Sequence, residues 1–405
     1  AYIALAAAAV FIILGIIPIN RAFMAVDWNV ILMIVGTMGV VGFFIESKMP
    51  SRLADYIIIW VPDIRWAIIS LSLFAGIISA FIDNVATVLM VAPVAVNISK
   101  KLKMSPVLSV VCIAISSNLQ GAATLVGDTT SILLGGHAGL SFIDFFFLDG
   151  KPGIFWAVEA GALVSAIVLL ILFRKEKEPI GSHNITEVKD YFPTVLLAGI
   201  IVLLIINSFI PSESKPEAIR DFMNGIICMG LFIIGLIREV IKRKSFKAVI
   251  DAVRSIDYDT ILLLAGLFIV IGGITEVGVV KDISQIFVRV SKDNVFLIYS
   301  LIVWASVLFS AFIDNIPYVA TMLPVTGEIS RMMGIEPNLL YFGLLIGATL
   351  GGNITPIGAS ANITGIGILR KEGYEVSAKT FMKVSIPFTL SAVITGYLLI
   401  WFIWS

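Results

Sequence analysis

The sequence predicts an all-α polytopic membrane protein made of two inverted-topology repeats, each with a re-entrant hairpin and a discontinuous helix. Composition gives the class: of 405 residues, 59% are hydrophobic and 14% are charged, and the mean hydropathy is +1.02. Soluble domains carry about 25% charged residues. The repeat is indicated by a hexapeptide, Ser79 to Asn84, which recurs unchanged as Ser310 to Asn315. The discontinuous helices are indicated by glycine-rich interruptions at matching places in both halves.

The duplication extends beyond the hexapeptide. Pro93 corresponds to Pro324 at the same offset of 231 residues, and Asp27 corresponds to Asp257 at an offset of 230. We therefore divide the chain into a first repeat, residues 1–178, and a second repeat, residues 179–405.

Nine apolar stretches are long enough to cross a bilayer, which takes about 20 helical residues. They are residues 1–19, 28–45, 107–135, 154–173, 192–210, 222–237, 258–275, 339–369 and 381–404. The stretches 107–135 and 339–369 hold so many Gly, Thr, Asn and Pro residues that a regular lipid-facing helix is excluded, because freed backbone groups need partners. These two are the predicted discontinuous helices.

Two further apolar regions, residues 66–99 and 295–329, are interrupted at mid-length by Asp-Asn. Each could form two ordinary crossings, but the halves are short and the polar tip would then lie outside the membrane. A re-entrant hairpin with its tip in the bilayer middle is favoured, provided that the tip lines a cavity. Residues 49–60 and 279–290 precede the hairpins and mix charged with apolar residues, which predicts interfacial amphipathic helices, as scaffold or as plain linkers.

Charges in the loops orient the chain. Five basic clusters fall on one face, predicted to be cytoplasmic, if the hairpins return to their own side. They are Lys48 with Arg52; Lys100, Lys101 and Lys103; Arg174, Lys175 and Lys177; Arg238, Lys242, Arg243, Lys244 and Lys247; and Arg370 with Lys371. Lys281, Arg289 and Lys292 are exceptions on the opposite face. Five crossings separate Asp27 from Asp257, and an odd number inverts the second repeat. Residues 192–210 have no counterpart in the first repeat, so we expect an additional upstream span to supply it.

The chemistry is predicted to lie at the hairpin tips. An ionised carboxylate at the centre of a membrane helix costs on the order of 2.5 to 3.5 kcal/mol, so Asp83 and Asp314 indicate a cation, a proton or a charged partner. The alternative role for each is to cap the following helix. Asp128 adds a third carboxylate to the first repeat, whereas its counterpart is Ala359, which predicts two unequal sites. Glu159 is a possible proton relay or a bundle-facing side chain hydrogen-bonded to a hydroxyl group.

Interrupted helices at matching positions of two halves predict a transporter site. The candidate ion-binding residues are Asp83, Asn84, Asn118, Gly121, Thr124, Asp128, Thr129, Asp314, Asn315, Gly352, Asn353, Thr355, Ser360 and Asn362. Among them, the sodium candidates are the tip residues Asp83, Asn84, Asp314 and Asn315. No cofactor is expected other than a sodium ion or proton as the coupling ion.

At these motifs the chain resembles the ion transporter superfamily that includes the NhaD sodium/proton antiporters, the melanosomal P protein, the ArsB arsenite permeases and the divalent-anion/sodium symporters. Residues 79–87, 310–317, 347–353 and 357–362 are most similar to the NhaD and P protein branch. The resemblance covers nearly the whole chain and implies a scaffold, a moving transport domain and a homodimer. One motif departs from the family: relatives commonly carry Gly-Asp-Pro-Pro-Asn where this chain has Gly127 to Ser131.

Two transport hypotheses follow. The first is a cation/proton antiporter in which Asp83 and Asp314, aided by Asp128, bind sodium or protons alternately. The second is cation-coupled transport of a carboxylate or another small anion, or of arsenite. A passive channel is the alternative of another class, and an intramembrane aspartyl protease leaves the duplicated tips without a role, so no enzyme is predicted. A net charge of zero suggests no nucleic-acid partner. The expected location is a prokaryotic inner membrane, with lipid and a second copy of the chain as partners.

Overall fold

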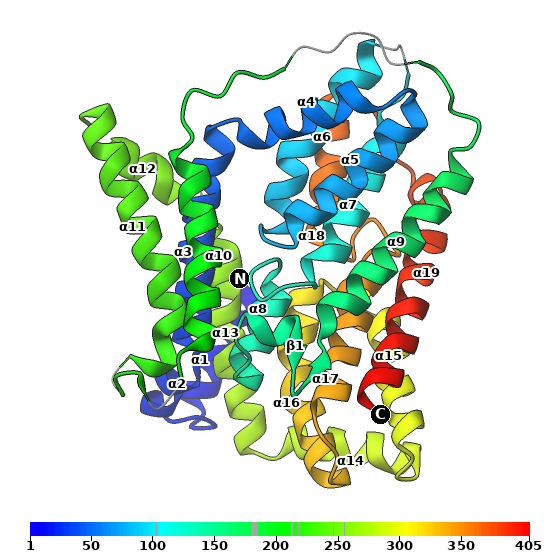
Figure 1. The fold of residues 1–405 in the computed structure, drawn as a ribbon. Coiled ribbons are helices and arrows are strands. Elements are labelled where there is room, and N and C mark those ends of the chain that lie inside the picture. Colours follow the sequence, from blue (N-terminus) through cyan, green and yellow to red (C-terminus); the bar gives the residue numbers. More distant parts are fainter. Residues whose placement is uncertain (102–103, 180–184, 212–213, 218, 246, 255) are drawn as a thin grey trace.

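The computed structural model describes residues 1–101, 104–179, 185–211, 214–217, 219–245, 247–254 and 256–405. The described chain is almost entirely helical, with one small antiparallel pair of strands, β1 (Phe147–Leu148) and β2 (Lys151–Pro152). Figure 1 shows the helices as a bundle of roughly parallel and antiparallel rods, with α4 and α14 lying across its two ends.

The first repeat contains the following helices: α1 (Tyr2–Ile13), α2 (Ile19–Ala25), α3 (Trp28–Glu46), α4 (Met49–Trp60), α5 (Ile64–Ser79), α6 (Asn84–Lys101), α7 (Val107–Gly121), α8 (Thr129–Ala138), the short 3-10 helix η1 (Ile143–Phe145), and α9 (Ile154–Leu172).

The second repeat contains α10 (Phe192–Phe209), η3 (Arg220–Phe222), α11 (Met223–Arg243), α12 (Lys247–Arg254), α13 (Tyr258–Glu276), α14 (Val279–Ser291), α15 (Val295–Ser310), α16 (Asn315–Met333), α17 (Asn338–Leu345), the π-helix η4 (Ile346–Leu350), α18 (Ser360–Lys371) and α19 (Ala378–Trp404).

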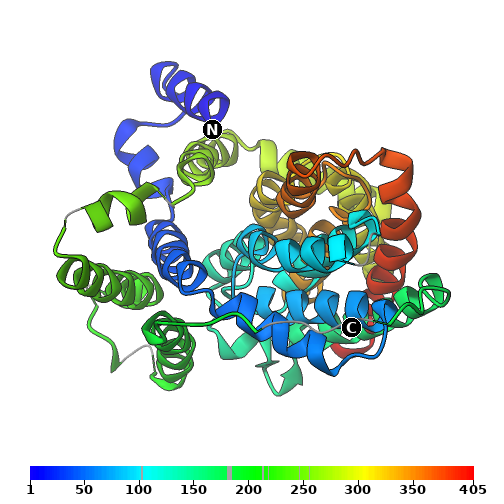
Figure 2. The same cartoon turned by 90° about the horizontal axis from the view of Figure 1, so that it is seen from above.

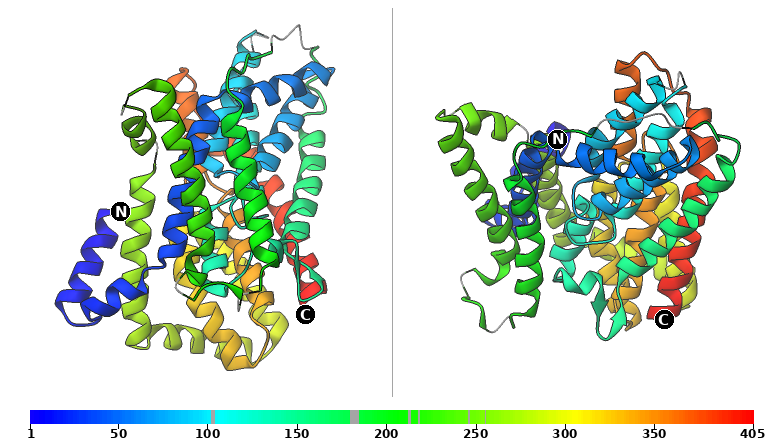
Figure 3. Two further views of the ribbon diagram at one scale, coloured as in Figure 1. Left: turned by 60° about the vertical axis from the view of Figure 1, so that its left-hand side comes forward. Right: turned by 45° about the horizontal axis from the view of Figure 1, so that its top comes forward.

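The helices form two groups, which we call the scaffold group and the site group. In the scaffold group, α11 and α10 pack on α3, and α1 packs on α13. In the site group, α5 and α6 pack on α7, α15 packs on η4, and α19 packs on α9. Figures 2 and 3 show the scaffold group on one side of the molecule and the site group on the other. The contacts between them come mainly from α3 with α8 and α13 with α16.

A helical hairpin lies at each of the two predicted positions. The first consists of α5 and α6 with Asp83 at its turn, and the second consists of α15 and α16 with Asp314 at its turn. In Figure 1 the first hairpin descends from the end that carries α4, and the second rises from the end that carries α14, so both turns lie in the middle of the bundle. The helices preceding them, α4 and α14, match the two predicted amphipathic segments.

Both predicted discontinuous helices are broken. The chain leaves helical geometry between α7 and α8, and again between η4 and α18. Glycine is required in each break because the hairpin approaches it closely. A Cβ on Gly127 would lie 2.7 Å from the carbonyl oxygens of Ser79 and Ala80, and a Cβ on Gly358 would lie 2.6 Å from that of Ser310. The same hairpin end therefore contacts the same glycine in both repeats.

The basic clusters gather at the α4 end, which we call the basic face. Contacts tie its loops together: Arg52 donates to the Tyr191 hydroxyl at 2.9 Å, the backbone N–H of Arg65 donates to the carbonyl of Glu176, and Lys100 pairs with Glu372. Lys103 lies outside the described residues. The three expected exceptions, Lys281, Arg289 and Lys292, belong to α14 and its C-terminal end at the opposite end of the bundle.

One prediction about the scaffold group was wrong, and one helix was missed. Residues 1–19 do not form one crossing, because α1 ends at Ile13 and the chain turns at Gly15, which has a φ of 69°. Pro18 then takes an extended conformation as the N-cap residue of α2. Helix α12 was not predicted at all. Six helices of the described chain are long and apolar enough to cross a membrane by themselves: α3, α9, α10, the helix from Arg220 to Arg243, α13 and α19.

Candidate functional site

The two hairpin tips present their aspartates in the same way. One oxygen of Asp83 accepts the backbone N–H groups of Val85 (3.0 Å) and Ala86 (3.1 Å), and one oxygen of Asp314 accepts that of Ile316 (3.0 Å). Both aspartates therefore cap the helix that follows, which was the alternative role considered for them. Capping uses one oxygen of each carboxylate and leaves the other oxygen for a different partner.

The second oxygens have different surroundings. In the second repeat, Ser360 at the start of α18 donates to Asp314 at 2.9 Å. In the first repeat, the corresponding residue is Thr129, and no hydrogen bond joins it to Asp83 within the described chain. Asp83 instead shares a pocket with Asp128, and Asp128 is close enough to both tip carboxylates to interact electrostatically with each.

Asn118 connects the two repeats at the centre of the site group. Its oxygen accepts from the side-chain amides of Asn84 (2.9 Å) and Asn315 (3.4 Å), one from each hairpin. Its own amide donates to the carbonyl of Thr349 (2.7 Å) and to the side chain of Asn353 (3.1 Å). One buried amide thus joins both hairpins to the second helix break.

Asp128 is held in the same network. Thr130 donates to one Asp128 oxygen at 2.9 Å, and Asn315 approaches that oxygen at 3.4 Å. The Thr130 hydroxyl also contacts that of Thr349 at 3.0 Å. The carboxylate of the first break is therefore held by the tip of the second hairpin, so the two repeats share one polar centre.

The remaining predicted residues hold the breaks in shape. Thr124 donates to the Ala80 carbonyl and Thr355 donates to the Ala311 carbonyl, so each break satisfies the last carbonyls of its hairpin's first helix. Asn362 spans its own loop by donating to the carbonyls of Gly352 and Thr355, both at 3.1 Å. Gly121 plays a similar part, because its carbonyl accepts from Ser131 at 3.4 Å.

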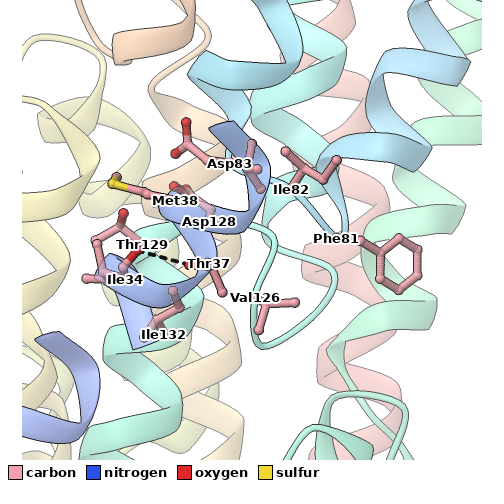
Figure 4. Close-up of a pocket in the computed structure, with 11 residues that line it drawn as sticks. Ile34, Thr37, Met38, Phe81, Ile82, Asp83, Val126, Asp128, Thr129 and Ile132 are labelled. Carbon is pink, nitrogen blue, oxygen red and sulfur yellow. Dashed lines mark hydrogen bonds between the residues drawn. The ribbon is translucent and has the colours of Figure 1, made fainter. Parts of the chain in front are cut away.

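A pocket separates the first hairpin tip from the scaffold group. We call it the first-repeat pocket; Asp83, Asp128 and Thr129 line one side, and Thr37 and Met38 of α3 line the other. Figure 4 shows Asp83 and Asp128 next to α3, which carries Thr37 and Met38. Its further lining residues are Ile34, Val41, Phe81, Ile82, Val126 and Ile132.

The centre is acidic and amide-rich. Among the described residues, no Lys, Arg or His side chain hydrogen-bonds or pairs with Asp83, Asp128 or Asp314, and no cluster of three His, Cys, Asp or Glu side chains is suited to hold a metal ion. Carboxylate, amide and carbonyl oxygens are the donors that hard cations prefer. Asp128 belongs to the amide network through Asn315, and Asp83 and Asp314 are each followed directly in the chain by an asparagine of that network.

Sequence reasoning missed several members of this network. The side chain of Thr130, rather than that of Thr129, donates to Asp128, and the Ser117 hydroxyl lies within hydrogen-bonding distance of both the Ser79 hydroxyl (3.1 Å) and the Asn84 carbonyl (3.0 Å). Their position beside the glycine break was the available signal. The contribution of α3 could not be foreseen, since Thr37 lies in an ordinary apolar helix. Glu159 on α9 shares no hydrogen bond or ion pair with these side chains in the described chain.

Two groups of helices, two facing hairpin tips and two broken helices around a polar centre define a multi-pass membrane transporter. The family model of the CitMHS citrate transporters matches residues 1–347, and the chain belongs to that family. An uncharacterized transporter of Mycobacterium bovis is 29% identical over 98% of this chain and 92% of its own length. The mouse P protein is 27% identical over 98% of this chain, which spans 56% of that protein. The predicted membership of the ion transporter superfamily is confirmed.

Solved transporters share the fold. The YdaH transporter of Alcanivorax borkumensis superposes with a TM-score of 0.64 at 13% identity, over 94% of this chain and 86% of that one. MtrF of Neisseria gonorrhoeae, described as one of a class of antimetabolite efflux pumps, superposes with a TM-score of 0.59 at 16% identity, over 97% and 83%. At such identities the likeness concerns the fold alone.

Proposed function

We propose that this protein is a secondary active transporter that exchanges sodium or a similar monovalent cation for protons by alternating access. The observation that carries the proposal is the shared polar centre, where Asp83, Asp128 and Asp314 lie beside buried asparagines without a basic partner among the described residues. Unpaired carboxylates inside a membrane persist where they bind a cation or a proton. Three of them in one network favour exchange between the two.

Each tip offers a distinct cation site. In the second repeat, Asp314 and the Ser360 hydroxyl supply oxygen ligands. In the first, the free oxygen of Asp83 faces the first-repeat pocket beside Asp128. Like charges in one cavity disfavour simultaneous ionisation, so a cation that binds at Asp83 would compete with a proton shared by Asp83 and Asp128. That competition is the physical basis of the proposed exchange.

The arrangement of the hairpins supports alternating access. We propose that both hairpins are re-entrant, the first from the cytoplasm and the second from outside, because the basic face would be cytoplasmic by the positive-inside rule. The tips then meet near the bilayer middle, where a site at the interface of two inverted repeats can open to either side by the same relative motion. The site group would move as the transport domain against the scaffold group.

Cation-coupled transport of a carboxylate is the second candidate, favoured by the citrate transporter family. Helices α6, α8, α16 and α18 all begin at the centre, and helix N-termini attract anions. Without an arginine or lysine among the described residues of the centre, a carboxylate would need cations bound first at Asp83 and Asp314 to cancel their charge. Homodimer formation and location in a prokaryotic inner membrane remain predictions.

Proteoliposomes test the proposal. With the purified chain reconstituted, an imposed sodium gradient should move protons in the opposite direction, read as a change in lumenal pH. Asp63→Asn is a matched control, because Asp63 caps α5 away from the centre and Asn can also cap. No proton movement in the native chain would refute antiport. Sodium-dependent uptake of radiolabelled citrate in the same vesicles would then establish the second candidate.

A further inference from the structure

The scaffold group closes against the first repeat through a tight seam between α3 and α8. A Cβ on Gly136 would lie 2.5 Å from the side chain of Val30 and 2.6 Å from that of Asp27, so only glycine fits there. Asp27 caps α3 by accepting the N–H of Val30 at 3.0 Å. The seam therefore joins the C-terminal part of α8 to the N-terminal end of α3.

The corresponding seam in the second repeat is open. Gly367 of α18 corresponds to Gly136, yet a Cβ there would meet no atom within 4 Å. The N-terminal end of α13 is nevertheless capped in the same way as that of α3, because Asp257 accepts the N–H of Thr260 at 3.1 Å. Figure 2 shows α13 (yellow-green) and α18 (orange-red) standing apart. The second repeat thus holds both halves of a seam that is not made.

The exposed fractions of side chains at the hairpin tip and helix break also differ between the two repeats. In the first repeat, Ile82 and Ile132 are 1% and 4% exposed beneath α3. Their counterparts Ile313 and Ile363 are 46% and 53% exposed. A cavity lies at this uncovered surface, the second-repeat pocket, lined by Phe312, Thr355, Pro356, Ile357, Ile363, Ile366, Gly367, Arg370, Val376, Ala378 and Met382. An apolar surface covered in one repeat is therefore bare in the other.

The charges at the open seam are complementary. Arg370 lies one turn beyond Gly367 at the mouth of the second-repeat pocket, and no ion pair joins it to another described residue. Its counterpart, Gly139, lines a cavity together with Asp27, Trp28 and Asn29 at the start of α3. The equivalent start of α13 carries Asp257 and Asp259. Closing the seam in the first repeat's geometry would bring Arg370 to these two carboxylates.

We propose that the basic-face gate of this transporter closes when α18 docks on the N-terminal end of α13, with Gly367 against Thr260 and Arg370 paired with Asp257 and Asp259. The proposal rests on the alternating access set out above. In the docked state α13 covers Ile313 and Ile363, just as α3 covers their counterparts in the present structure. At the same time the seam between α3 and α8 opens at the end of the bundle opposite the basic face. The ion pairs of Arg370 then stabilise the docked state and so shift the equilibrium between the docked and undocked states.

Cysteine cross-linking tests the seam without relying on transport. In a background with Cys112→Ala and Cys228→Ala, the pair Thr260→Cys and Gly367→Cys should form a disulfide with copper phenanthroline, although the present structure keeps the two positions apart. Thr260→Cys with Leu369→Cys is the control, because Leu369 is fully buried on the opposite side of α18, and it should not cross-link. Adding Arg370→Gln should lower the docked population by about two- to fivefold, the range of an exposed ion pair.

The outcomes separate this inference from the proposed function. A pair that fails to cross-link while the same variant exchanges sodium for protons would overturn the inference and leave the function standing. Cross-linking in a chain without sodium/proton exchange would support the seam and refute antiport. If the double-cysteine variant is inactive, Gly367→Phe provides the test instead. The phenylalanine side chain fits the open space in this structure, so the variant should fold, but it should block docking and abolish transport. Normal transport by Gly367→Phe would refute the docked state.

Discussion

The scaffold group covers the hairpin tip and the helix break of the first repeat, whereas part of the corresponding surface of the second repeat is exposed. Helix α3 packs on α8 and lines the pocket at Asp83, whereas the equivalent surface around Ile313 and Ile363 is exposed. The two repeats carry the same hexapeptide, the same capped tips and the same glycine contacts between hairpin and break. Their difference is therefore partly one of position relative to the scaffold group, and partly one of sequence, since the first repeat carries Asp128 where the second carries Ala359. Variants that act unequally on the repeats can separate these two causes.

Removing the tip carboxylates has the largest expected effect. We expect Asp83→Asn and Asp314→Asn each to reduce sodium/proton exchange to the level of empty vesicles, because the amide still caps the helix but cannot exchange a cation for a proton. The measurement is lumenal pH under a sodium gradient, with circular dichroism to confirm the fold. Full exchange in Asp314→Asn would show that the second repeat is a structural copy without a coupling role.

The next largest effect is expected at the position where the first repeat has Asp128 and the second has Ala359. Asp128→Ala makes the first repeat resemble the second, and we expect slower exchange with a narrower pH range, since the proton shared with Asp83 is lost. Ala359→Asp should be destabilising by about 3 kcal/mol, the cost of a carboxylate at the membrane centre. Initial rates across pH and thermal unfolding in detergent measure the two effects. An unchanged pH profile in Asp128→Ala would remove Asp128 from the proton pathway.

Much of this comparison could be predicted from the sequence, for physical reasons. The repeated Asp-Asn and the glycine-rich breaks identified both hairpins and both discontinuous helices, because polar groups in an apolar span need a special backbone. Packing between distant helices leaves no such local mark. Thr37 and Met38 lie in a plain apolar helix, and Thr130 differs from Thr129 only in the direction its side chain points once α8 forms. The turn at Gly15 was hidden within a continuous apolar run.

A smaller effect is expected at Thr124 and Thr355, the threonines that hydrogen-bond each helix break to its hairpin. Thr124→Ala leaves the Ala80 carbonyl without its donor in a packed region, which costs about 1 to 3 kcal/mol of unfolding free energy. Thr355→Ala should cost less in the present state, because Thr355 borders the open second-repeat pocket and the Ala311 carbonyl can become hydrated. Thermal unfolding of both variants gives the comparison. Equal losses would contradict the difference in coverage between the repeats.

The smallest effect concerns the ion pairs that connect α10 and α11, the two helices that pack on α3. Arg238 of α11 donates to both oxygens of Asp190, at 2.7 and 3.0 Å, and Lys242 pairs with the same carboxylate, just before α10 begins. The Arg238 hydrogen bonds, followed by those from Lys242, hold the pKa of Asp190 well below its usual range. A depressed folded-state pKa stabilises the protein above the unfolded pKa of about 3.9, and this contribution fades as the pH falls below that value.

Asp190→Asn should therefore lower stability by up to about 1 kcal/mol at neutral pH, as expected for a partly exposed ion pair. The difference from the native chain should shrink as the pH is lowered from 5 towards about 3, where the native carboxylate begins to lose its charge advantage. Thermal unfolding in detergent at each pH measures it, and Asp221→Asn, an exposed carboxylate at the other end of α11, is the control. A difference that grows on acidification would show that Asp190 supports α10 and α11 by its hydrogen bond to the Phe192 N–H rather than by its charge.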